Sequence, residues 1–480
     1  MAGPTRYLSS RDRSSFVPVH AVWEITLACD LKCDHCGSRA GKRRPEELTT
    51  EESLELVRQM ARLGTREITL IGGEAYLRRD WLEIIREIRA QGMDCTMQSG
   101  GLNLTEQRIK AAVDAGLQGL GVSIDGLREV HDKLRGVKGS FDAAFKALHL
   151  IRKHGLTASV NTQITSLVIR QLRELMELFI DAGASGWQVQ LTVAMGRAAD
   201  HPELLLQPHE LLELMPLLAE LYREGADRGF LLQPGNNIGY FGPYESVWRG
   251  SGDDRVYWTS CNAGQNTLGI EADGTIKGCP SLPTSPYSGG NIRDLSLSDI
   301  WWQSDELNLN RGRTSAGLWG FCGSCYYADV CKAGCTWTTH SLLGRAGNNP
   351  YCHHRVLELA EQGLRERIVQ VERAPGTSFD HGRFELIVES LAGGSVVDRL
   401  PANGTALVQL TSARKQTKRK STRKPKELII CRSCDRHVFA GTIVCPFCNE
   451  DVPTHAKRHA KNLKDARKAY QRLLNLLPNK

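Results

Sequence analysis

Three cysteines near the start of the chain constrain its fold and chemistry more than any other feature. Cys29, Cys33 and Cys36 are spaced C-x3-C-x2-C and directly follow the apolar run 22–27. Cysteine thiolates ligate iron–sulfur clusters, and a cubane 4Fe–4S cluster has four irons to ligate. Three cysteines leave one iron without a protein ligand, so that iron can bind a small chelating molecule. Zinc, the alternative metal, normally takes four ligands and often uses paired C-x2-C sequences.

Apolar residues between positions 20 and 230 follow a repeating strand–helix pattern. The expected strands are 22–27, 67–71, 93–97, 119–124, 156–164 and 187–193. The expected helices are 53–63, 79–90, 106–115, 140–154 and 169–182. Six such units predict an α/β fold in which parallel strands are joined by crossover helices. Ligands of such folds bind at the carboxyl ends of the strands.

Short polar motifs lie at or just past the expected strand ends. Gly72-Gly73-Glu74 follows one strand, and Ser123-Ile124-Asp125-Gly126 follows another. His131-Asp132-x-x-Arg135-Gly136 comes next, and Gln190 lies in the last strand, before Met195-Gly196-Arg197-Ala198. Glycines let a backbone approach a ligand closely, and a carboxylate accepts hydrogen bonds from an ammonium group. An arginine fork matches a carboxylate.

Together these motifs resemble the radical S-adenosylmethionine (SAM) superfamily. The resemblance implies a partial (β/α)6 barrel and a SAM-binding 4Fe–4S cluster on Cys29, Cys33 and Cys36. It also implies SAM contacts from Gly72, Gly73, Glu74, Ser123, Asp125, Arg135 and Gln190. Glu74 would bind the amino group, and Arg135 would bind the carboxylate. The chain departs from the usual pattern at Ala75, where relatives carry proline, and at Gln98-Ser99-Gly100, where many carry Thr-Asn-Gly.

A second cysteine set resembles the SPASM extension of radical SAM peptide and protein maturases. Its members are Cys261, Cys279, Cys322, Cys325, Cys331, Cys335 and Cys352, with C-x2-C-x5-C-x3-C in the middle. The resemblance implies two auxiliary 4Fe–4S clusters. The distal one is assigned to Cys322, Cys325, Cys331 and Cys352, and the proximal one to Cys261, Cys279 and Cys335. A zinc ribbon on Cys322, Cys325, Cys331 and Cys335 is the alternative, but it leaves three cysteines unused.

The proximal cluster lacks a fourth cysteine ligand, because residues 253–260 contain no cysteine. Either another residue type fills that place or the iron is open to substrate, for example to a thiolate. Pro280 follows Cys279, where sulfatase-maturing relatives carry an aspartate base. Sulfatase maturation is therefore not expected.

The basic charge of the chain is confined to its C-terminal part. Residues 411–480 contain 18 Lys and Arg against 5 Asp and Glu, whereas the remainder contains 43 against 49. A low-complexity basic linker at 411–426 precedes Cys431-x2-Cys434-x10-Cys445-x2-Cys448. Two such pairs predict a tetrahedral zinc ribbon, with a further iron–sulfur cluster as the alternative. A basic amphipathic helix is expected over 455–477. The fifteenth cysteine, Cys95, is expected to be a core residue.

These observations divide the chain into seven segments. They are an N-terminal tail (1–18), a radical SAM core (19–230), a SPASM domain (231–367), an extension of unassigned role (368–410), the basic linker (411–426), the zinc ribbon (427–453) and the basic helix (454–480). Many peptide maturases begin with a leader-binding domain, for which no room is expected before Cys29. The leader would then bind elsewhere or to a separate protein.

The predicted function is that of a radical SAM oxidoreductase acting as a peptide maturase. It would cleave SAM reductively to a 5′-deoxyadenosyl radical, abstract a hydrogen from a ribosomally made precursor peptide and form a thioether or other crosslink. One alternative is a small-molecule substrate such as a tetrapyrrole or sugar. Another is nucleic-acid binding through the basic tail. Flavodoxin or ferredoxin is the expected electron donor, and an acidic leader the expected ligand of the tail. No signal peptide or membrane span is found, so a cytoplasmic protein is expected.

Overall fold

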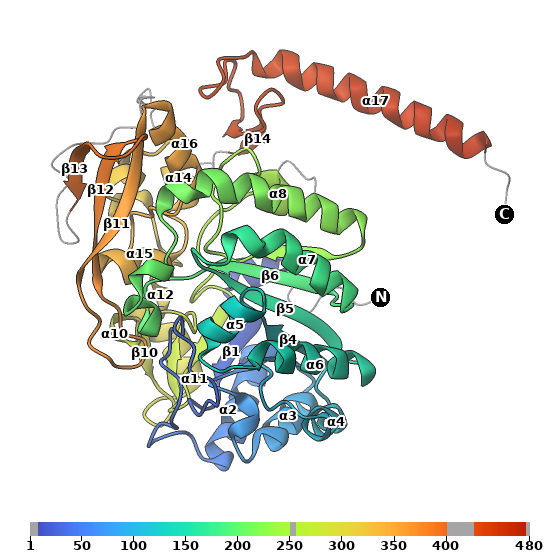
Figure 1. The fold of residues 1–480 in the computed structure, drawn as a ribbon, viewed down its shortest axis with the longest axis vertical. Helices are drawn as coiled ribbons and strands as arrows, with labels where there is room; N and C mark the ends of the chain where they lie inside the picture. The colour runs from blue at the N-terminus through green and yellow to red at the C-terminus, as the bar shows by residue number, and fades with distance from the viewer. Residues whose placement is uncertain (1–7, 250–255, 401–426, 477–480) are drawn as a thin grey trace.

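The computed structural model describes residues 8–249, 256–400 and 427–476, and its centre is a ten-stranded sheet (Figure 1). The strand order is β10-β9-β8-β1-β2-β3-β4-β5-β6-β7. Seven parallel strands follow one another across it: β1 His20–Glu24, β2 Glu67–Ile71, β3 Asp94–Ser99, β4 Gly119–Ser123, β5 Thr157–Ile164, β6 Gly186–Leu191 and β7 Leu231–Pro234. Their carboxyl ends therefore meet at one edge, as the sequence pattern predicts.

Crossover helices cover the outer face of the parallel strands. They are α2 Thr50–Leu63, α3 Trp81–Ala90, α4 Glu106–Ala115, α5 Arg128–Arg135, α6 Ser140–Lys153, α7 Leu172–Asp181 and α8 Leu211–Asp227, and the short α1 Ser10–Ser14 precedes β1. Helix α2 shows why these segments are helical: Thr49 and Glu52 form a capping box, and Gly64 ends the helix in the left-handed conformation. Helix α5, which carries the His131–Arg135 motif, was not expected from the apolar pattern.

The auxiliary region adds strands to the free side of β1. Strand β8 (Thr267–Ile270) pairs in parallel with β1, with Thr267 opposite His20. Strands β9 (Thr275–Lys277) and β10 (Ser288–Asn291) continue the sheet in antiparallel fashion. Short helices complete the region: α9 Glu245–Trp248, α10 Thr284–Tyr287, α11 Leu297–Gln303, α12 Asp305–Asn308, α13 Gly320–Ser324, α14 Ala328–Cys331, α15 Thr336–Leu343 and α16 His353–Glu361. This continuity fixes the SPASM cysteines relative to the barrel.

The C-terminal part forms two smaller sheets and one long helix. Strands β11 (Leu364–Glu372), β12 (Arg383–Ser390) and β13 (Val396–Leu400) form an antiparallel sheet in the extension. The hairpin of β14 (Leu428–Ile430) and β15 (His437–Phe439) leads to α17 (Val452–Leu476), which projects from the body (Figure 1). The predicted linker 411–426 lies outside the described residues. Among the described helices, none combines the length and apolar character needed to cross a membrane.

Candidate active site and cluster ligands

The three N-terminal cysteines (Cys29, Cys33 and Cys36) lie in the loop after β1, at the carboxyl edge of the sheet. They line a cavity of about 260 Å³, here called the cysteine-loop cavity, together with residues from the ends of β2 to β6. Backbone amides of Leu31 and Ala40 point at Cys29 Sγ and Cys36 Sγ, each at 3.4 Å. Burial raises the pKa of Cys29 to about 12, so a bound metal is needed to keep this ligand as a thiolate.

Arg197, which follows β6, holds the cysteine loop in place through hydrogen bonds to three of its carbonyl groups. Its backbone amide donates to Cys36 O (3.0 Å), and its guanidinium donates to Cys33 O (2.6 Å) and Ala40 O (3.0 Å). Arg197 belongs to a 3-10 turn, Gly196–Ala199, that follows β6. The Gly-Arg-Ala motif noted in the sequence therefore fixes the backbone that presents the cysteines.

Gly72 and Gly73 bring the β2 loop against the cysteine loop itself. Gly73 N donates to Thr26 O (2.8 Å) and Glu74 N donates to Ala28 O (2.7 Å). A Cβ on Gly72 would lie 2.3 Å from Thr26 O, and one on Gly73 would lie 2.1 Å from Ala28 O. From the sequence, these glycines were expected to let the backbone approach a ligand. In the structure they are already required because any side chain would collide with the backbone of residues 26–28.

Glu74 presents a buried carboxylate to the cysteine-loop cavity. It accepts hydrogen bonds from Ser99 Oγ and Gly100 N, both at 2.6 Å. Burial raises the pKa of Glu74 to about 7. A cationic amino group in the cavity would offset that burial and favour the carboxylate, as expected for the ammonium of SAM. Gly72, Gly73, Ser123, Arg135 and Gln190 also line this cavity.

Asp125 differs from the other predicted SAM contacts because it is not among the residues that line the cavity. Its carboxylate pairs with Arg135 and with His35 Nε2 (2.8 Å), and it accepts from Gln163 N (2.7 Å). Burial alone would raise the pKa of Asp125, but the Arg135 guanidinium and His35 outweigh burial and hold it below its ordinary value. Arg135 Nη1 in turn lies 3.7 Å from Cys33 Sγ. Asp125 thus orients a cation beside a cluster cysteine.

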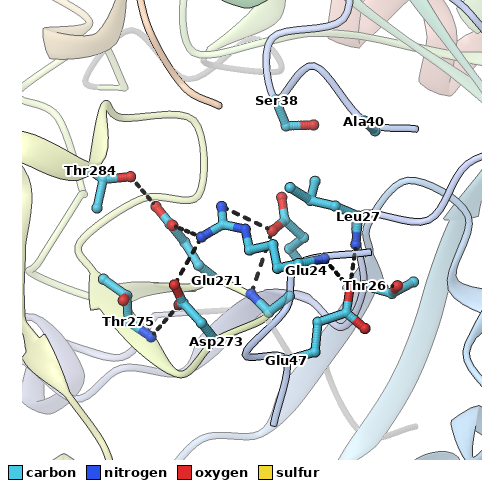
Figure 2. Close-up of polar contacts among 12 residues, drawn as sticks. Glu24, Thr26, Leu27, Ser38, Ala40, Glu47, Glu271, Asp273, Thr275 and Thr284 are labelled. Atoms are coloured by element: carbon cyan, nitrogen blue, oxygen red, sulfur yellow. Dashed lines mark hydrogen bonds and ion pairs between the residues drawn. The ribbon is translucent and has the colours of Figure 1, made fainter. Parts of the chain in front are cut away.

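A buried charge network that the sequence argument missed borders the same cavity. Glu24, at the end of β1, lies 3.5 Å from Arg44 Nη2 and 3.4 Å from Ala272 N, and Arg44 Nη1 also pairs with Glu271 (2.8 Å) and Asp273 (3.0 Å). Figure 2 shows the second carboxylate oxygen of Glu24 pointing away from these partners, toward the side of Ser38. Burial raises the pKa of Glu24 to about 8 despite Arg44. In the sequence, the signal that could have revealed this network was a single glutamate, Glu24, within an otherwise apolar strand.

Phe379 also lines the cysteine-loop cavity, although the sequence showed no chemistry in the extension. Its ring covers the ammonium of Lys277 at 3.9 Å, and its backbone adopts a positive φ of 58°. The next residue, Asp380, accepts from Arg39 Nε (2.7 Å), and its carbonyl accepts from Gly196 N (2.7 Å). The extension is therefore part of the cavity wall.

The auxiliary cysteines gather in two groups. The distal set (Cys322, Cys325, Cys331 and Cys352) lines a small enclosed apolar cavity. Two members of the proximal set, Cys279 and Cys335, line a second cavity of about 390 Å³. Burial, and next the neighbouring Cys261 thiol, raise the pKa of Cys279 to about 11 and of Cys335 to about 12. Cys279 and Cys335 thus lie next to Cys261, and which cysteines ligate which cluster stays a prediction.

The cysteine-loop cavity and the second cavity share a wall. Gln190, Pro280, Ser281 and Trp337 line both of them. Trp337 Nε1 donates to Met195 Sδ at 2.9 Å, which ties the auxiliary domain to the loop after β6. The wall therefore lies between the cluster site expected to activate SAM and the proximal cysteines.

The ribbon cysteines (Cys431, Cys434, Cys445 and Cys448) are arranged differently. All four sulfurs lie within 4.8 Å of one another, and no such close grouping joins the other cysteine sets in the described part of the chain. The pairs Cys431–Cys448 and Cys434–Cys445 are 3.8 and 3.7 Å apart. Cys95, the cysteine outside all sets, is fully buried in β3.

Comparisons with known proteins agree with this arrangement. Residues 23–192 match the model of the radical SAM superfamily, and residues 261–326 match that of the SPASM iron–sulfur cluster-binding domain. The chain therefore contains a radical SAM domain and a SPASM domain. These two domains imply SAM and 4Fe–4S clusters, and cysteine thiols in loops of this kind fit such clusters.

Curated proteins similar to this chain carry two kinds of name. AdoMet-dependent heme synthase of Oleidesulfovibrio alaskensis is 27% identical over 356 residues, covering 69% of this chain and 86% of that protein. Mycofactocin maturase MftC of Mycolicibacterium smegmatis is 28% identical over 333 residues, covering 69% and 81%. PqqA peptide cyclase of Rhizobium meliloti is 28% identical over 339 residues, covering 70% and 87%.

Solved structures show the same fold at lower identity. Streptococcus suis SuiB bound to SAM superposes with a TM-score of 0.54 at 16% identity, over 70% of this chain and 76% of that one. The enzyme anSMEcpe, bound to AdoMet and a peptide, gives 0.55 at 18% identity, over 72% and 99%.

Proposed function

We propose that this radical SAM/SPASM enzyme modifies a ribosomally made peptide. The observation that carries the proposal is the shared wall, because it lies between the N-terminal cysteines and the proximal cysteines. When bound, the N-terminal cluster and SAM supply a 5′-deoxyadenosyl radical that abstracts hydrogen from the substrate. A peptide segment at the wall would be within reach of both cysteine sites.

The protein's own residues would bind and orient SAM. Glu74 would accept the amino group, Arg135 would bind the carboxylate, and Ser123 and Gln190 would contact the remainder of the molecule. Gly72 and Gly73 would keep the β2 loop against the cysteine loop. Glu24 would offer a buried carboxyl to the substrate, either to hydrogen-bond an amide or to take up a proton.

The polar groups that line the two cavities favour a peptide over a tetrapyrrole. Amide side chains are frequent there, namely Gln163, Gln188, Gln190, Gln233, Asn236 and Asn262, in addition to Gln98, Asn237 and Asn266, which are already hydrogen-bonded within the protein. Amides pair with the N–H and C=O groups of a peptide backbone. Among the described lining residues, the arginines are Arg135 and Arg197. Arg197 is hydrogen-bonded to the cysteine loop, and Arg135 pairs with Asp125 and is the residue proposed for the SAM carboxylate. A tetrapyrrole needs cations for its several carboxylates.

A tetrapyrrole substrate is the second candidate, because heme synthases are among the relatives. The two can be separated with anaerobically reconstituted enzyme, a reductant such as flavodoxin or ferredoxin, and SAM. The first arm adds the peptide encoded by a neighbouring short reading frame. The second adds Fe-coproporphyrin III, the porphyrin that one relative is named for making, and follows whether it is converted further. A mass loss in the peptide supports the proposal. Turnover of the porphyrin with an unchanged peptide refutes it.

We further propose that helix α17 recruits an acidic leader segment of that peptide. The described part of the helix is exposed, with Leu463 at 46% and Tyr470 at 64%. Its cations are Lys457, Arg458, Lys461, Lys464, Arg467, Lys468 and Arg472, and Asp465 is the acidic residue among them. Opposite charges accelerate encounter and are screened by salt.

Removal of residues 454–480 tests this role. Peptide binding should weaken, and the loss should shrink as salt is raised, while SAM cleavage without peptide stays the same. If the shortened protein binds the leader at full strength and instead loses affinity for RNA, the helix serves the nucleic-acid alternative.

A further inference from the structure

The C-terminal ribbon is packed against the auxiliary domain, next to the distal set. Tyr327 Oη donates to His437 O at 2.6 Å, and Phe439 N donates to Tyr326 Oη at 3.1 Å. Leu428, in β14, is fully buried in the same hydrophobic cluster as Cys325, Cys331 and Cys352. A hairpin that follows the 401–426 segment thus contributes to the core around the distal cysteines.

Aromatic rings continue this contact. Tyr327 stacks on Phe241 with ring centres 4.1 Å apart, and on its ribbon side it lies near Phe447, at 5.9 Å. Phe447 also meets the edges of Tyr326 (5.3 Å) and His354 (5.7 Å). Phe241, Tyr327 and His354 line the distal cavity. Phe447 of the ribbon therefore packs against Tyr327 and His354, which line the cavity of the distal set.

A buried arginine, Arg436, joins the ribbon to helix α16. Arg436, which is 5% exposed, lies 3.2 Å from Glu358 Oε1 and hydrogen-bonds with His354 Nδ1. Its guanidinium also covers the Phe447 ring at 3.8 Å. Glu358 and His354 belong to α16, directly after Cys352. A buried guanidinium and a buried carboxylate are tolerated only when they pair with each other. The Arg436–Glu358 contact therefore indicates that the ribbon and α16 form a specific interface.

The ribbon cysteines fit one tetrahedral metal ion. A zinc–sulfur distance of about 2.3 Å places tetrahedral sulfurs about 3.8 Å apart, and the two pairs are 3.8 and 3.7 Å apart. A four-iron cubane is larger and spreads its thiolates further. The geometry therefore favours zinc over the iron–sulfur alternative at this site.

We propose that the ribbon, folded around zinc on Cys431, Cys434, Cys445 and Cys448, is a lid that closes the distal cluster site. The hydrophobic cluster around the four cysteines is too small to fold without its metal: Cys431, Val438, Cys445 and Val452 are its buried members, and Leu428 is buried against the auxiliary domain instead. Zinc binding in the ribbon and the integrity of the distal site are thereby linked. The zinc has a structural role, and it is bound to the enzyme body instead of forming a separate nucleic-acid module.

The test uses the full chain carrying Cys29→Ala, Cys33→Ala and Cys36→Ala, so that only auxiliary clusters contribute to the spectrum. Four proteins are compared: this background, Cys434→Ser/Cys448→Ser in it, Phe447→Ala in it, and Ile443→Ala as a control on an exposed ribbon residue. Metal content, hydrogen exchange of segment 325–331 and iron release to a chelator are measured. Removing zinc from the unmutated ribbon with a zinc-selective chelator is an arm that needs no ribbon variant.

The lid predicts one zinc per chain in the background and in Phe447→Ala, and none in the cysteine double variant. Exchange of segment 325–331 and iron release should be about tenfold faster in the double variant, in Phe447→Ala and after zinc removal, and unchanged in Ile443→Ala. Unchanged exchange and iron release in zinc-free protein would overturn the lid. Iron instead of zinc on the ribbon cysteines would overturn the metal assignment.

Discussion

Replacing Asp380 with alanine should loosen the junction between the extension and the cysteine loop. The Asp380 carboxylate accepts from Arg39 Nε at 2.7 Å and also from the backbone amides of Gly376 (2.5 Å) and Thr377 (3.0 Å). Its side chain is 4% exposed. Arg39 lies three residues after Cys36 and bridges to Asp200 as well. The substitution removes one anion from this bridge and leaves two amides without their acceptor.

The size of the effect follows from these contacts. Removing one partner of a buried ion pair costs about 3–5 kcal/mol when the remaining charge has no other partner. Arg39 keeps its contacts with Asp200 and the Gly196 carbonyl. The substitution should therefore lower the free energy of local opening of residues 376–382 by a smaller amount, about 2 kcal/mol. At 1.4 kcal/mol for each factor of ten, this corresponds to about thirtyfold faster local opening.

Hydrogen exchange of the 376–382 amides measures this opening directly. Glu372→Ala is the matched control, because Glu372 ends β11, just before the connection that contains Asp380, and pairs with Arg383, but its side chain is 57% exposed. An exposed pair contributes at most about 1 kcal/mol, so the control should change exchange less than about fivefold. Equal exchange in Asp380→Ala and the unmutated protein would refute the reasoning that Arg39 and Asp380 join the extension to the cysteine loop.

Three further predictions concern the clusters and the cavity. Alanine at all three N-terminal cysteines should remove about four of about twelve irons and abolish 5′-deoxyadenosine formation, as measured by iron analysis and chromatography; residual formation would contradict the site. In the same variant, a small thiol should perturb the spectrum of the proximal cluster but not of the distal one; no change would indicate a resident fourth ligand. Glu24→Gln should gain stability relative to the unmutated protein as pH rises. Because the pKa of Glu24 is raised to about 8 in the folded protein, its contribution to stability is fully present below pH 4.5 and is lost as the pH rises to about 8. Between pH 6 and pH 8, the free energy of unfolding of the unmutated protein should therefore fall by about 2 kcal/mol relative to that of Glu24→Gln, as measured by chemical denaturation. A constant difference would mean that Glu24 ionises normally.

Local sequence signals sufficed for most of the strand–helix framework, whereas the assignment of the cysteines to clusters stays a prediction. Strand β2 and helix α4 have the predicted bounds, because each has apolar residues at the spacing of its own element. Helix α5 was missed because its buried residues, His131, Leu134 and Arg135, include two polar ones. An apolar pattern cannot reveal a helix whose inner side is made of paired polar groups.

Contacts between distant segments could not be predicted in this way. Strand β8 pairs with β1, and Arg44 joins Glu24 to Glu271, although the intervening chain includes most of the barrel. Register and ion pairing across such separations depend on tertiary packing, on which local composition carries no information. The same holds for Phe379, which reaches the cavity only because Asp380 is bound by Arg39 and Gly196.

The residue after Cys279 shows how sequence and structure combine. Proline stands at position 280, where the resemblance places an aspartate base in sulfatase-maturing enzymes, and the sequence therefore offers no reason to expect sulfatase maturation. In the structure, Pro280 and Glu24 line the same cavity, and Glu24 comes from β1, which pairs with β8 of the auxiliary domain. A buried carboxyl thus reaches the cavity from another strand. Because Glu24 also faces Arg44, its protonation depends on the network that joins β1 to residues 271–273. Chemistry at the cavity is therefore coupled to how the barrel and the auxiliary domain pack together.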